Sequence, residues 1–386
     1  MHLTDKIYLF ILLIFSSSCI KQFTPVIDEN VAAKFVVTGR VTDAEGWQEV
    51  NVSFSSPIEA PEYIPATGCQ VKIKDDKGNT FSLEEELPGN YRVWMAKDYL
   101  VPGTSYKLEI LTPNNEKIES TYDRMIQGPS LDSVYYVLKD IPTYEPSINI
   151  RGAQFCIDLN AEGLESRYFK WEILETWEYH AEHKKEFYYD GDWHEIIPPD
   201  SATKICWITR SVKNIYTVST NNFTRNAYKQ FPLQFVDGIN SNRFEILYSI
   251  LVTQFAVSEG AYSYWDQVRI NSTEQGGLYE KQPLDIKGNL TNISNPQNEV
   301  LGYFYAATGS TRRFFYKDIK DLELNYLRPC VVSVLDPYGG WKDFDKIEYP
   351  VYYFYNEEGK LRILSTECVD CRLSDGVTTK PDFWPY

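Results

Sequence analysis

Short stretches in which apolar and polar residues alternate dominate the first third of the chain. In Cys69–Lys74, for example, Cys69, Val71 and Ile73 fall on one face, because successive side chains of a strand point to opposite sides of the sheet. Turns that contain Gly, Asn or Pro separate such stretches at intervals of about 8–12 residues. About seven strands fit into residues 33–125, and this pattern predicts an immunoglobulin-like β-sandwich.

A second β-rich region is expected over residues 126–386. Its longest alternating run, Tyr168–Tyr179, exceeds the usual strand length and predicts a two-stranded ribbon that turns near Asp190–Asp192. One helix is expected near residues 259–271, because Ser258 suits the N-cap and large apolar residues follow at helical spacing. The chain is therefore expected to be mainly β, with an immunoglobulin-like β-sandwich followed by a larger β-rich domain that carries one short helix.

The composition supports a folded, aromatic-rich protein with an acidic surface. Of 386 residues, 43% are hydrophobic, 29 are Tyr and 9 are Trp, which fits a protein built from strands. The net charge of −16 repels phosphate backbones, so a nucleic-acid partner is not expected. Two interpretations of the aromatic residues stay open: exposed rings that bind sugars or peptides, and rings that fill sheet surfaces and cores.

The start of the chain has the layout of a secretory signal. Nine apolar residues, Ile7–Phe15, are followed by three serines and Cys19. This apolar run is too short for a membrane span, which takes about 20 residues. The pattern predicts a lipoprotein signal peptide over residues 1–18, a lipid on Cys19 and a tether over residues 19–32. Ser16 departs from the Leu that a bacterial lipobox usually has there, so an ordinary signal peptide and an uncleaved anchor are the alternatives.

Six cysteines follow the lipidation candidate, and an exported chain can keep them as disulfides. The pair Cys368-x-x-Cys371 has no second pair of Cys or His nearby to complete a zinc site, and no helical pattern of the kind that supports a redox pair. Structural cysteines are favoured over zinc ligands, a redox pair or free thiols. We expect at least one disulfide within Cys330, Cys368 and Cys371, and Cys156 and Cys206 are further disulfide candidates.

No motif of a known metal site or catalytic site stands out. His180 and His183 lack the spacing of a zinc protease motif and would point to opposite faces of a strand. They are expected at a solvated hairpin tip, with adventitious metal binding as the alternative. Acidic runs such as Glu84–Glu86 are expected to be solvated. The chain is therefore expected to hold no metal and no cofactor and to be no enzyme, with an unrecognised hydrolase as the remaining alternative.

The predicted ribbon is the best candidate for contact with a partner. Aromatic residues crowd it, and aromatic residues are enriched in interface cores. The candidate contact residues are Trp171, Trp177, Tyr179, Tyr188, Tyr189 and Trp193. The rival interpretation is that these rings pack on their own domain.

Four segments of the second region, together with the start of the chain, form a family signature. They are Tyr-Ser-Tyr-Trp-Asp-Gln at 262–267 with Gly-Gly-Leu-Tyr at 276–279, Gln-Pro-Leu-Asp-Ile-Lys-Gly-Asn at 282–289, Val-Leu-Gly-Tyr-Phe at 300–304, and Cys-x-x-Cys-Arg…Lys-Pro-x-Phe-Trp from Cys368. On these residues the chain resembles domain of unknown function family 4249. Asp375 stands where the family is expected to have the first of two glycines.

The resemblance implies a place and a set of neighbours. Members look like Bacteroidota-type lipoproteins, often encoded beside TonB-dependent outer-membrane receptors, and no catalytic residues are established for them. We therefore expect a lipid-anchored outer-membrane protein, on the cell surface or the periplasmic face. Its expected role is that of a non-catalytic accessory or ligand-capture subunit of a TonB-dependent transporter barrel. The alternative is a free-standing binding or adhesion lipoprotein for glycan or peptide.

Overall fold

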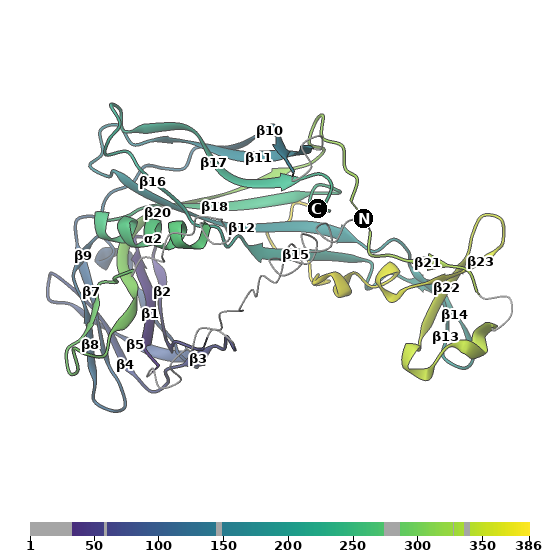
Figure 1. The fold of residues 1–386 in the computed structure, drawn as a ribbon, viewed down its shortest axis with the longest axis horizontal. Coiled ribbons are helices and arrows are strands. Elements are labelled where there is room, and N and C mark those ends of the chain that lie inside the picture. The colour runs from purple at the N-terminus through teal and green to yellow at the C-terminus, as the bar shows by residue number, and fades with distance from the viewer. Residues whose placement is uncertain (1–32, 58–59, 144–148, 274–285, 327, 336–339) are drawn as a thin grey trace, which may run out of the picture.

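The fold is known from a computed structural model (Figure 1). The structure describes residues 33–57, 60–143, 149–273, 286–326, 328–335 and 340–386. The predicted signal peptide, the lipidation candidate Cys19 and the predicted tether all lie outside these residues. Within them, no helix combines the length and the apolar character needed to cross a bilayer.

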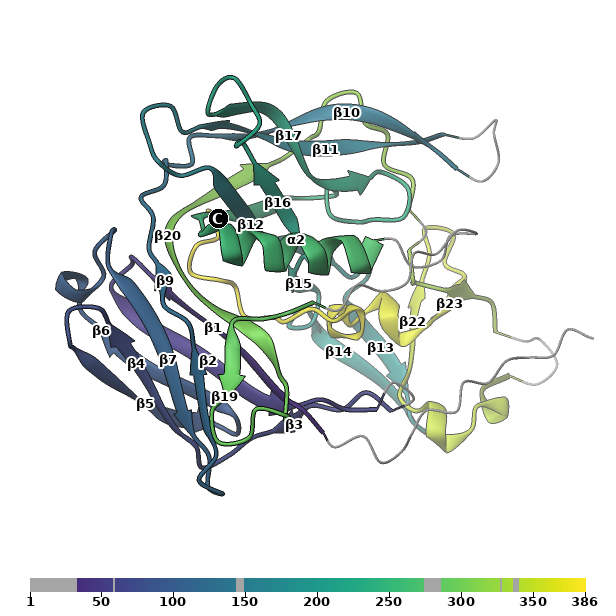
Figure 2. The ribbon, with the colours of Figure 1, turned by 60° about the vertical axis from the view of Figure 1, so that its left-hand side comes forward.

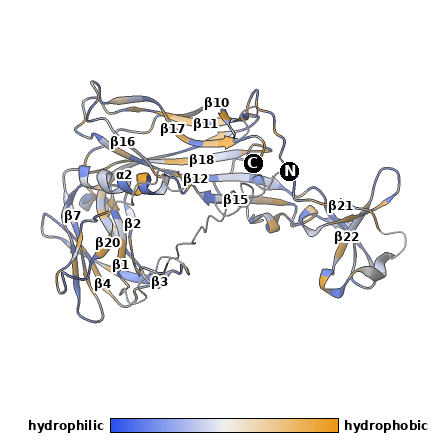
Figure 3. Cartoon of the chain, in the orientation of Figure 1, coloured by the Kyte–Doolittle hydropathy of each residue, from blue (hydrophilic) through white to orange (hydrophobic). Residues whose placement is uncertain are grey.

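Strands dominate the described residues, which confirms the expected mainly β fold. They form three sheets of 15, 3 and 5 strands. Hydrophobic residues recur along the strands of every sheet, as Figure 3 shows. The one α-helix in the described part of the chain is α2 (Glu259–Thr273). Short 3-10 helices are η1 (Lys97–Tyr99), η2 (Gly340–Asp343), η3 (Lys346–Glu348), η4 (Thr366–Cys368) and η5 (Cys371–Ser374).

The first strands of the chain enclose one hydrophobic core and form a region that we call the sandwich (Figure 1). Its strands are β1 (Phe35–Thr42), β2 (Gly46–Phe54), β3 (Ile64–Pro65), β4 (Gln70–Asp75), β5 (Thr80–Leu87), β6 (Asn90–Met95), β7 (Ser105–Leu111), β8 (Lys117–Ser120) and β9 (Asp123–Arg124). The strand order β1-β2-β6-β5 continues through β5 into β4-β7-β8. Val71 and Ile73 point into the core as their alternation predicts. The immunoglobulin-like topology stays a prediction.

Strands from much later in the chain complete the sandwich. β19 (Leu290–Asn292) pairs with β8. The first half of β20 (Val300–Tyr316) pairs in parallel with every residue of β1. The expected domain of residues 33–125 is therefore incomplete, because part of its sheet comes from residues 290–307. Local residue patterns do not show which distant strands pair, so the boundary at residue 125 missed this contribution.

A glycine allows β20 to lie close against β1. Gly302 has a φ of +106°, which side chains rarely tolerate, and a Cβ at this position would lie 1.9 Å from the carbonyl oxygen of Val37. Farther along β20, Phe304 and Ala306 are fully buried in the sandwich core. The strand thus contributes both a close backbone approach and part of the core.

The second half of β20 leaves the sandwich and joins a central sheet. There it pairs with β18, and the sheet continues through β12 to β15 and β16. These strands are β18 (Tyr248–Ala256), β12 (Tyr168–His180), β15 (Ile205–Ser211) and β16 (Tyr216–Ser219). A three-stranded sheet of β10 (Val134–Pro142), β11 (Asn149–Asn160) and β17 (Ala227–Asp237) packs on it. Figure 2 shows α2 where the central sheet meets the sandwich.

A buried carboxylate joins three of these elements. Asp123 of β9 is 5% exposed and accepts hydrogen bonds from the backbone N–H of Ala306 (2.9 Å) and from the hydroxyl of Ser258 (2.5 Å). Ser258 in turn accepts from the N–H of Ala261 (3.1 Å), so it caps α2 as its sequence position predicts. Burial raises the pKa of Asp123 to about 6, and the two hydrogen bonds only partly oppose that rise.

The run Tyr168–Asp192 does not form the single ribbon that its alternation predicts. β12 ends first, and the chain then crosses to another sheet, where β13 (Lys185–Tyr189) and β14 (Trp193–Asp200) form a hairpin. The three-stranded sheet packs on one face of β12, and on the other face Trp265 lies over Lys170 and Trp384 donates to Glu178. Lys170 and Thr176, which alternation places on the polar face, are 4% and 0% exposed.

The hairpin belongs to a five-stranded sheet that we call the C-terminal lobe (Figure 1). Its strand order is β14-β13-β22-β23-β21. The added strands are β21 (Val332–Ser333), β22 (Val351–Tyr355) and β23 (Leu361–Leu364). In the described residues, its buried hydrophobic residues form two small clusters, one of Val351, Tyr353 and Ile363 and one of Leu364, Cys368 and Val369. Partly buried aromatic side chains surround the first cluster.

Candidate binding cleft

Three charged side chains meet where the sandwich joins the central sheet. Arg40 of β1 and Lys170 of β12 both bind Oε1 of Glu172, at 2.6 Å from Nη1 and 2.5 Å from Nζ. The Lys170 side chain is 5% exposed, whereas those of Arg40 and Glu172 are 37% and 39% exposed. Burial alone would raise the pKa of Glu172, but the two cations outweigh it and hold that pKa below its ordinary value. Glu172 is therefore ionised at neutral pH.

Two adjoining cavities open beside this cluster, and we call them together the junction cleft. Their volumes are about 440 and 460 Å³, and both are lined by Glu172 and Trp265. Lys170 lines the second cavity. The sandwich side of the first cavity is lined by Thr38, Arg40, Thr42, Trp47, Glu49 and Asn51. Volumes of this order are typical of small-molecule sites in proteins.

The sandwich wall of the cleft follows from the two-residue period of its strands. Trp47, Glu49 and Asn51 point outward from β2, opposite Trp94, Arg92 and Asn90 of β6. The Arg92 guanidinium lies 4.1 Å from the centre of the Trp47 ring, and the Trp94 ring meets Trp47 edge to face at 5.6 Å. These contacts hold the half-exposed Trp47 ring in place. The sequence analysis did not single out this face, although two tryptophans at outward positions of alternating strands were a readable signal.

Helix α2 supplies the opposite wall. The Trp265 ring lies 4.5 Å from Nζ of Lys170 and meets the buried Tyr305 edge to face at 6.4 Å. Its indole N–H is buried and, among the described residues, has no hydrogen-bond partner. A cation over an indole face is attracted by the ring quadrupole, so Lys170 and Trp265 stabilise each other's position. None of these cleft residues was a candidate in the sequence analysis.

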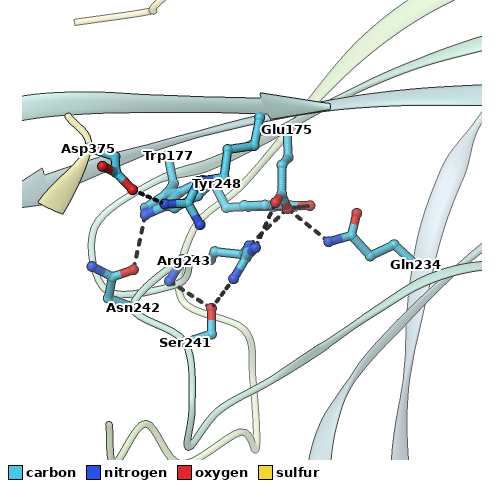
Figure 4. Close-up of polar contacts among 9 residues, drawn as sticks. Glu175, Trp177, Gln234, Ser241, Asn242, Arg243, Tyr248 and Asp375 are labelled. Carbon is cyan, nitrogen blue, oxygen red and sulfur yellow. Dashed lines mark hydrogen bonds and ion pairs between the residues drawn. The ribbon is translucent and has the colours of Figure 1, made fainter. Parts of the chain in front are cut away.

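A second polar cluster lies within the central sheet and is saturated with hydrogen bonds (Figure 4). Glu175 accepts from Arg243 twice, at 2.9 and 2.7 Å, from Gln234 at 2.8 Å and from Tyr248 at 3.2 Å. A carboxylate accepts about four hydrogen bonds, so Glu175 has no capacity left for a ligand. This network is structural, and it holds the loop that carries Arg243 against β12.

Three of the six predicted partner-contact residues are buried, so for them the prediction was wrong. Trp171, Trp177 and Tyr179 are at most 3% exposed. Trp177 donates to Asn242 (3.0 Å) and lies under the guanidinium of Arg243, 4.6 Å from the ring centre (Figure 4). The aromatic pattern of β12 reflects packing against the three-stranded sheet and this loop, which was the rival interpretation.

The other three partner-contact candidates lie in the C-terminal lobe. Tyr188 and Tyr189 are half-buried, and Trp193 is 54% exposed. Trp193 meets Trp341 at 4.3 Å and Tyr353 at 5.6 Å, both edge to face. Contact between Trp193 and a partner stays a prediction.

Both cysteines of the Cys-x-x-Cys pair form disulfides with distant cysteines. Cys368 is bonded to Cys330 and Cys371 to Cys206, so neither sulfur is available for zinc and the two do not form a redox pair with each other. The Cys330–Cys368 bridge confirms the prediction of at least one disulfide among Cys330, Cys368 and Cys371. Cys156 was also a disulfide candidate, and this was wrong: it is a buried free thiol on β11.

The histidines do not gather at one hairpin tip as expected. His180 ends β12 and lies 2.6 Å from a carboxylate oxygen of Glu178, whereas the His183 ring packs on Phe354 at 4.4 Å. In the described residues, one group of potential metal ligands comes together, namely Glu182, His183 and Cys330. The sulfur of Cys330 is held in a disulfide, so it offers no thiolate to a metal.

Comparison with known proteins identifies a family. No curated protein matches the chain. A family model described as a domain of unknown function, DUF4249, matches residues 20–313. The match includes every residue of the junction cleft named above and ends before the Cys-x-x-Cys signature at residue 368. Because it covers well over half of the chain, this protein belongs to the DUF4249 family.

Proposed function

We propose that this protein is a lipid-anchored, non-catalytic ligand-capture subunit of a TonB-dependent transporter in the outer membrane. The observation that carries the capture role is the junction cleft. It combines ligand-sized cavities, two half-exposed charged side chains and two tryptophans at its walls. Glu172 is paired and ionised at neutral pH, which suits a fixed binding contact better than proton donation.

The proposed place rests on the start of the chain and on the family. The apolar run Ile7–Phe15 before Cys19 supports export and acylation, and two acyl chains are enough for stable anchoring. The resemblance of family members to lipoproteins encoded beside TonB-dependent receptors supports a barrel partner. The match to the DUF4249 family over residues 20–313 is what this resemblance rests on.

The decisive experiment is purification of the tagged full chain from gently solubilised outer membranes, with mass spectrometry of co-purifying proteins. A barrel protein at near-equal amount is the expected result. The variant Cys19→Ala is expected to move from the membrane to the soluble fraction. An unchanged distribution of Cys19→Ala contradicts the lipid anchor, and absence of a barrel contradicts the transporter partnership.

A free-standing surface binding protein is the second candidate. Trp47 and Trp94 beside the cleft are exposed, and aromatic rings at the surface can bind a ligand without help from a barrel. This exposure is the observation that favours the second candidate. Purification without any barrel, combined with membrane retention that depends on Cys19, is the result that selects this function over the first.

A further inference from the structure

We propose that the junction cleft binds a neutral oligosaccharide. The inference rests on the proposed capture function and names the chemical class of the captured ligand. Three features of the cleft carry it: flat aromatic rings at its walls, hydrogen-bond donors and acceptors on neighbouring side chains, and a sandwich wall whose strands are paired on both sides.

The aromatic rings are placed as platforms for sugar rings. Trp47 on the sandwich and Trp265 on α2 line the same cavity of about 440 Å³. A sugar ring presents C–H groups on its faces, and an indole offers a large flat apolar surface to cover them. Arg92 covers one face of the Trp47 ring, and Trp94 meets the ring edge to face, so a sugar can pack only on the other face. Because these contacts already hold the ring, little side-chain entropy is lost when a ligand packs on it.

The charged cluster matches hydroxyl groups, which both donate and accept hydrogen bonds. Arg40 and Lys170 both bind Oε1 of Glu172, and no residue in the described part of the chain donates to its other oxygen, Oε2. Among the described residues, Arg40 donates from Nη1 alone, to Glu172 and Tyr305, so the donors on Nε and Nη2 stay available to a ligand. Adjacent hydroxyls of a sugar can accept from these donors and donate to Oε2. Asn51 and Asn90, bonded to each other at 2.7 Å, add amide groups at the mouth.

Charge favours a neutral ligand over an acidic one. The cleft contains the cations Arg40, Lys170 and Lys213 and the anions Glu49 and Glu172, so its charges nearly balance. The whole chain carries a net charge of −16, which repels anions at long range. An acidic ligand would meet both this field and the two cleft carboxylates.

Backbone pairing argues against an extended peptide. The sandwich wall is the face of β1, β2 and β6, and each of these strands has a neighbour on both sides in the order β20-β1-β2-β6-β5. Peptides that add to a sheet need an unpaired edge. The wall therefore offers side chains alone, as sugar recognition requires.

The test uses the full chain with Cys19→Ala, so that binding is read without the anchor. The protein is applied to an array that carries neutral oligosaccharides, acidic oligosaccharides and random hexapeptides, and hits are measured by titration calorimetry. Binding to neutral oligosaccharides is expected, with a dissociation constant that stays constant between about 0.05 and 0.5 M NaCl because no net charge is neutralised. Binding confined to acidic glycans, confined to peptides, or absent from the whole array overturns the proposal.

Matched variants locate the site. Trp47→Ala is expected to weaken binding at least tenfold, and Trp193→Ala, an equally exposed tryptophan in the C-terminal lobe, is expected to leave it unchanged. Arg40→Ala is compared with Arg225→Ala, which removes an exposed arginine paired with Glu162 outside the cleft. Circular dichroism checks that each variant is folded. Equal losses in the cleft and control variants overturn the cleft as the site.

A charge-neutralising variant gives an independent check. Glu172→Gln keeps an oxygen acceptor but leaves Arg40 and Lys170 without a counter-charge, so a neutral sugar should bind slightly more weakly. The unsubstituted protein is tested beside this variant. If it binds an acidic glycan more tightly than a neutral one, the proposal is contradicted. Barrel co-purification does not depend on the cleft, so failure of sugar binding and failure of the transporter partnership are read separately.

Discussion

The sandwich and the C-terminal lobe hold their strands together by different means. Among the described residues, the sandwich core contains 22 buried hydrophobic residues, and the one cysteine among them, Cys69, is a free thiol. The described part of the C-terminal lobe has two small clusters of three buried residues each, and a disulfide between Cys330 and Cys368 lies in one of them. A second disulfide, Cys206–Cys371, ties the adjoining segment to β15.

The difference follows from the area that each region removes from water. Apolar burial stabilises by roughly 25 cal/mol per Å², so a large core can offset the conformational entropy of its chain while a small one needs covalent help. Among the described residues, the free Cys69 lies in the sandwich core, and that core contains no disulfide. The contrast predicts that side-chain truncation damages the sandwich most and that reduction damages the lobe most.

The largest effect is expected from Phe304→Ala. Phe304 is fully buried in the sandwich core and lies on β20, which also belongs to the central sheet. Truncation of a buried phenylalanine costs about 3–5 kcal/mol of unfolding free energy. Urea denaturation followed by tryptophan fluorescence measures the loss. The control is Phe223→Ala at a 42% exposed position, and a Phe304→Ala loss no larger than that of the control contradicts the dominance of the sandwich core.

The next effect is expected from the paired substitution Cys330→Ala with Cys368→Ala. Loss of this bridge should cost roughly 2–4 kcal/mol, because the unfolded chain regains the freedom that the cross-link removed. The damage should concentrate in the lobe, so amide hydrogen exchange is expected to speed up in β22 and β23 and to stay unchanged in β1 and β7. Equal acceleration in both regions would show that the bridge stabilises the whole chain and not the lobe alone.

A smaller, pH-dependent effect is expected from Asp123→Asn. The folded-state pKa of about 6 lies above the unfolded value of about 3.8, so the folded protein binds the proton more tightly. The stability that this proton contributes is present below about pH 4 and lost as the pH rises through 6, up to about 3 kcal/mol. Asparagine carries no such proton. The variant's unfolding free energy should therefore fall less between pH 4 and pH 7, and parallel pH curves for the two proteins would disprove the shift.

The smallest effect is expected from Trp193→Ala in the C-terminal lobe. The ring is 54% exposed but meets Trp341 at 4.3 Å, and an aromatic pair of this kind contributes about 0.5–1.5 kcal/mol. Thermal unfolding monitored by near-ultraviolet circular dichroism should show a small loss. A loss as large as that of Phe304→Ala would mean that the aromatic residues of the lobe form a core as important as that of the sandwich.

Local features were predictable from sequence, and contacts between distant segments were not. The alternation of Val71 and Ile73 and the capping role of Ser258 depend on neighbouring residues, so a pattern reveals them. Burial of Trp177 depends on a loop about 65 residues away that covers it, and the split after β12 depends on pairing with β22. The alternation of β2 was enough to predict which of its side chains point outward. That these side chains lie near Lys170 and Trp265 depends on the pairing of β1 with β20.

The parallel pairing of β1 with β20 has a consequence for biogenesis. Lys34, just before β1, is ion-paired with Glu299, 265 residues later, just before β20. β1 can therefore pair with β2 early, but its other neighbour, β20, exists only when about three quarters of the chain have been made, and contacts this remote form slowly. For a chain that is threaded unfolded through a membrane, as the proposed signal peptide implies, this delay is useful. The sandwich lacks part of its sheet and of its core until residues 290–307 have been made, which favours an incompletely folded state during transport.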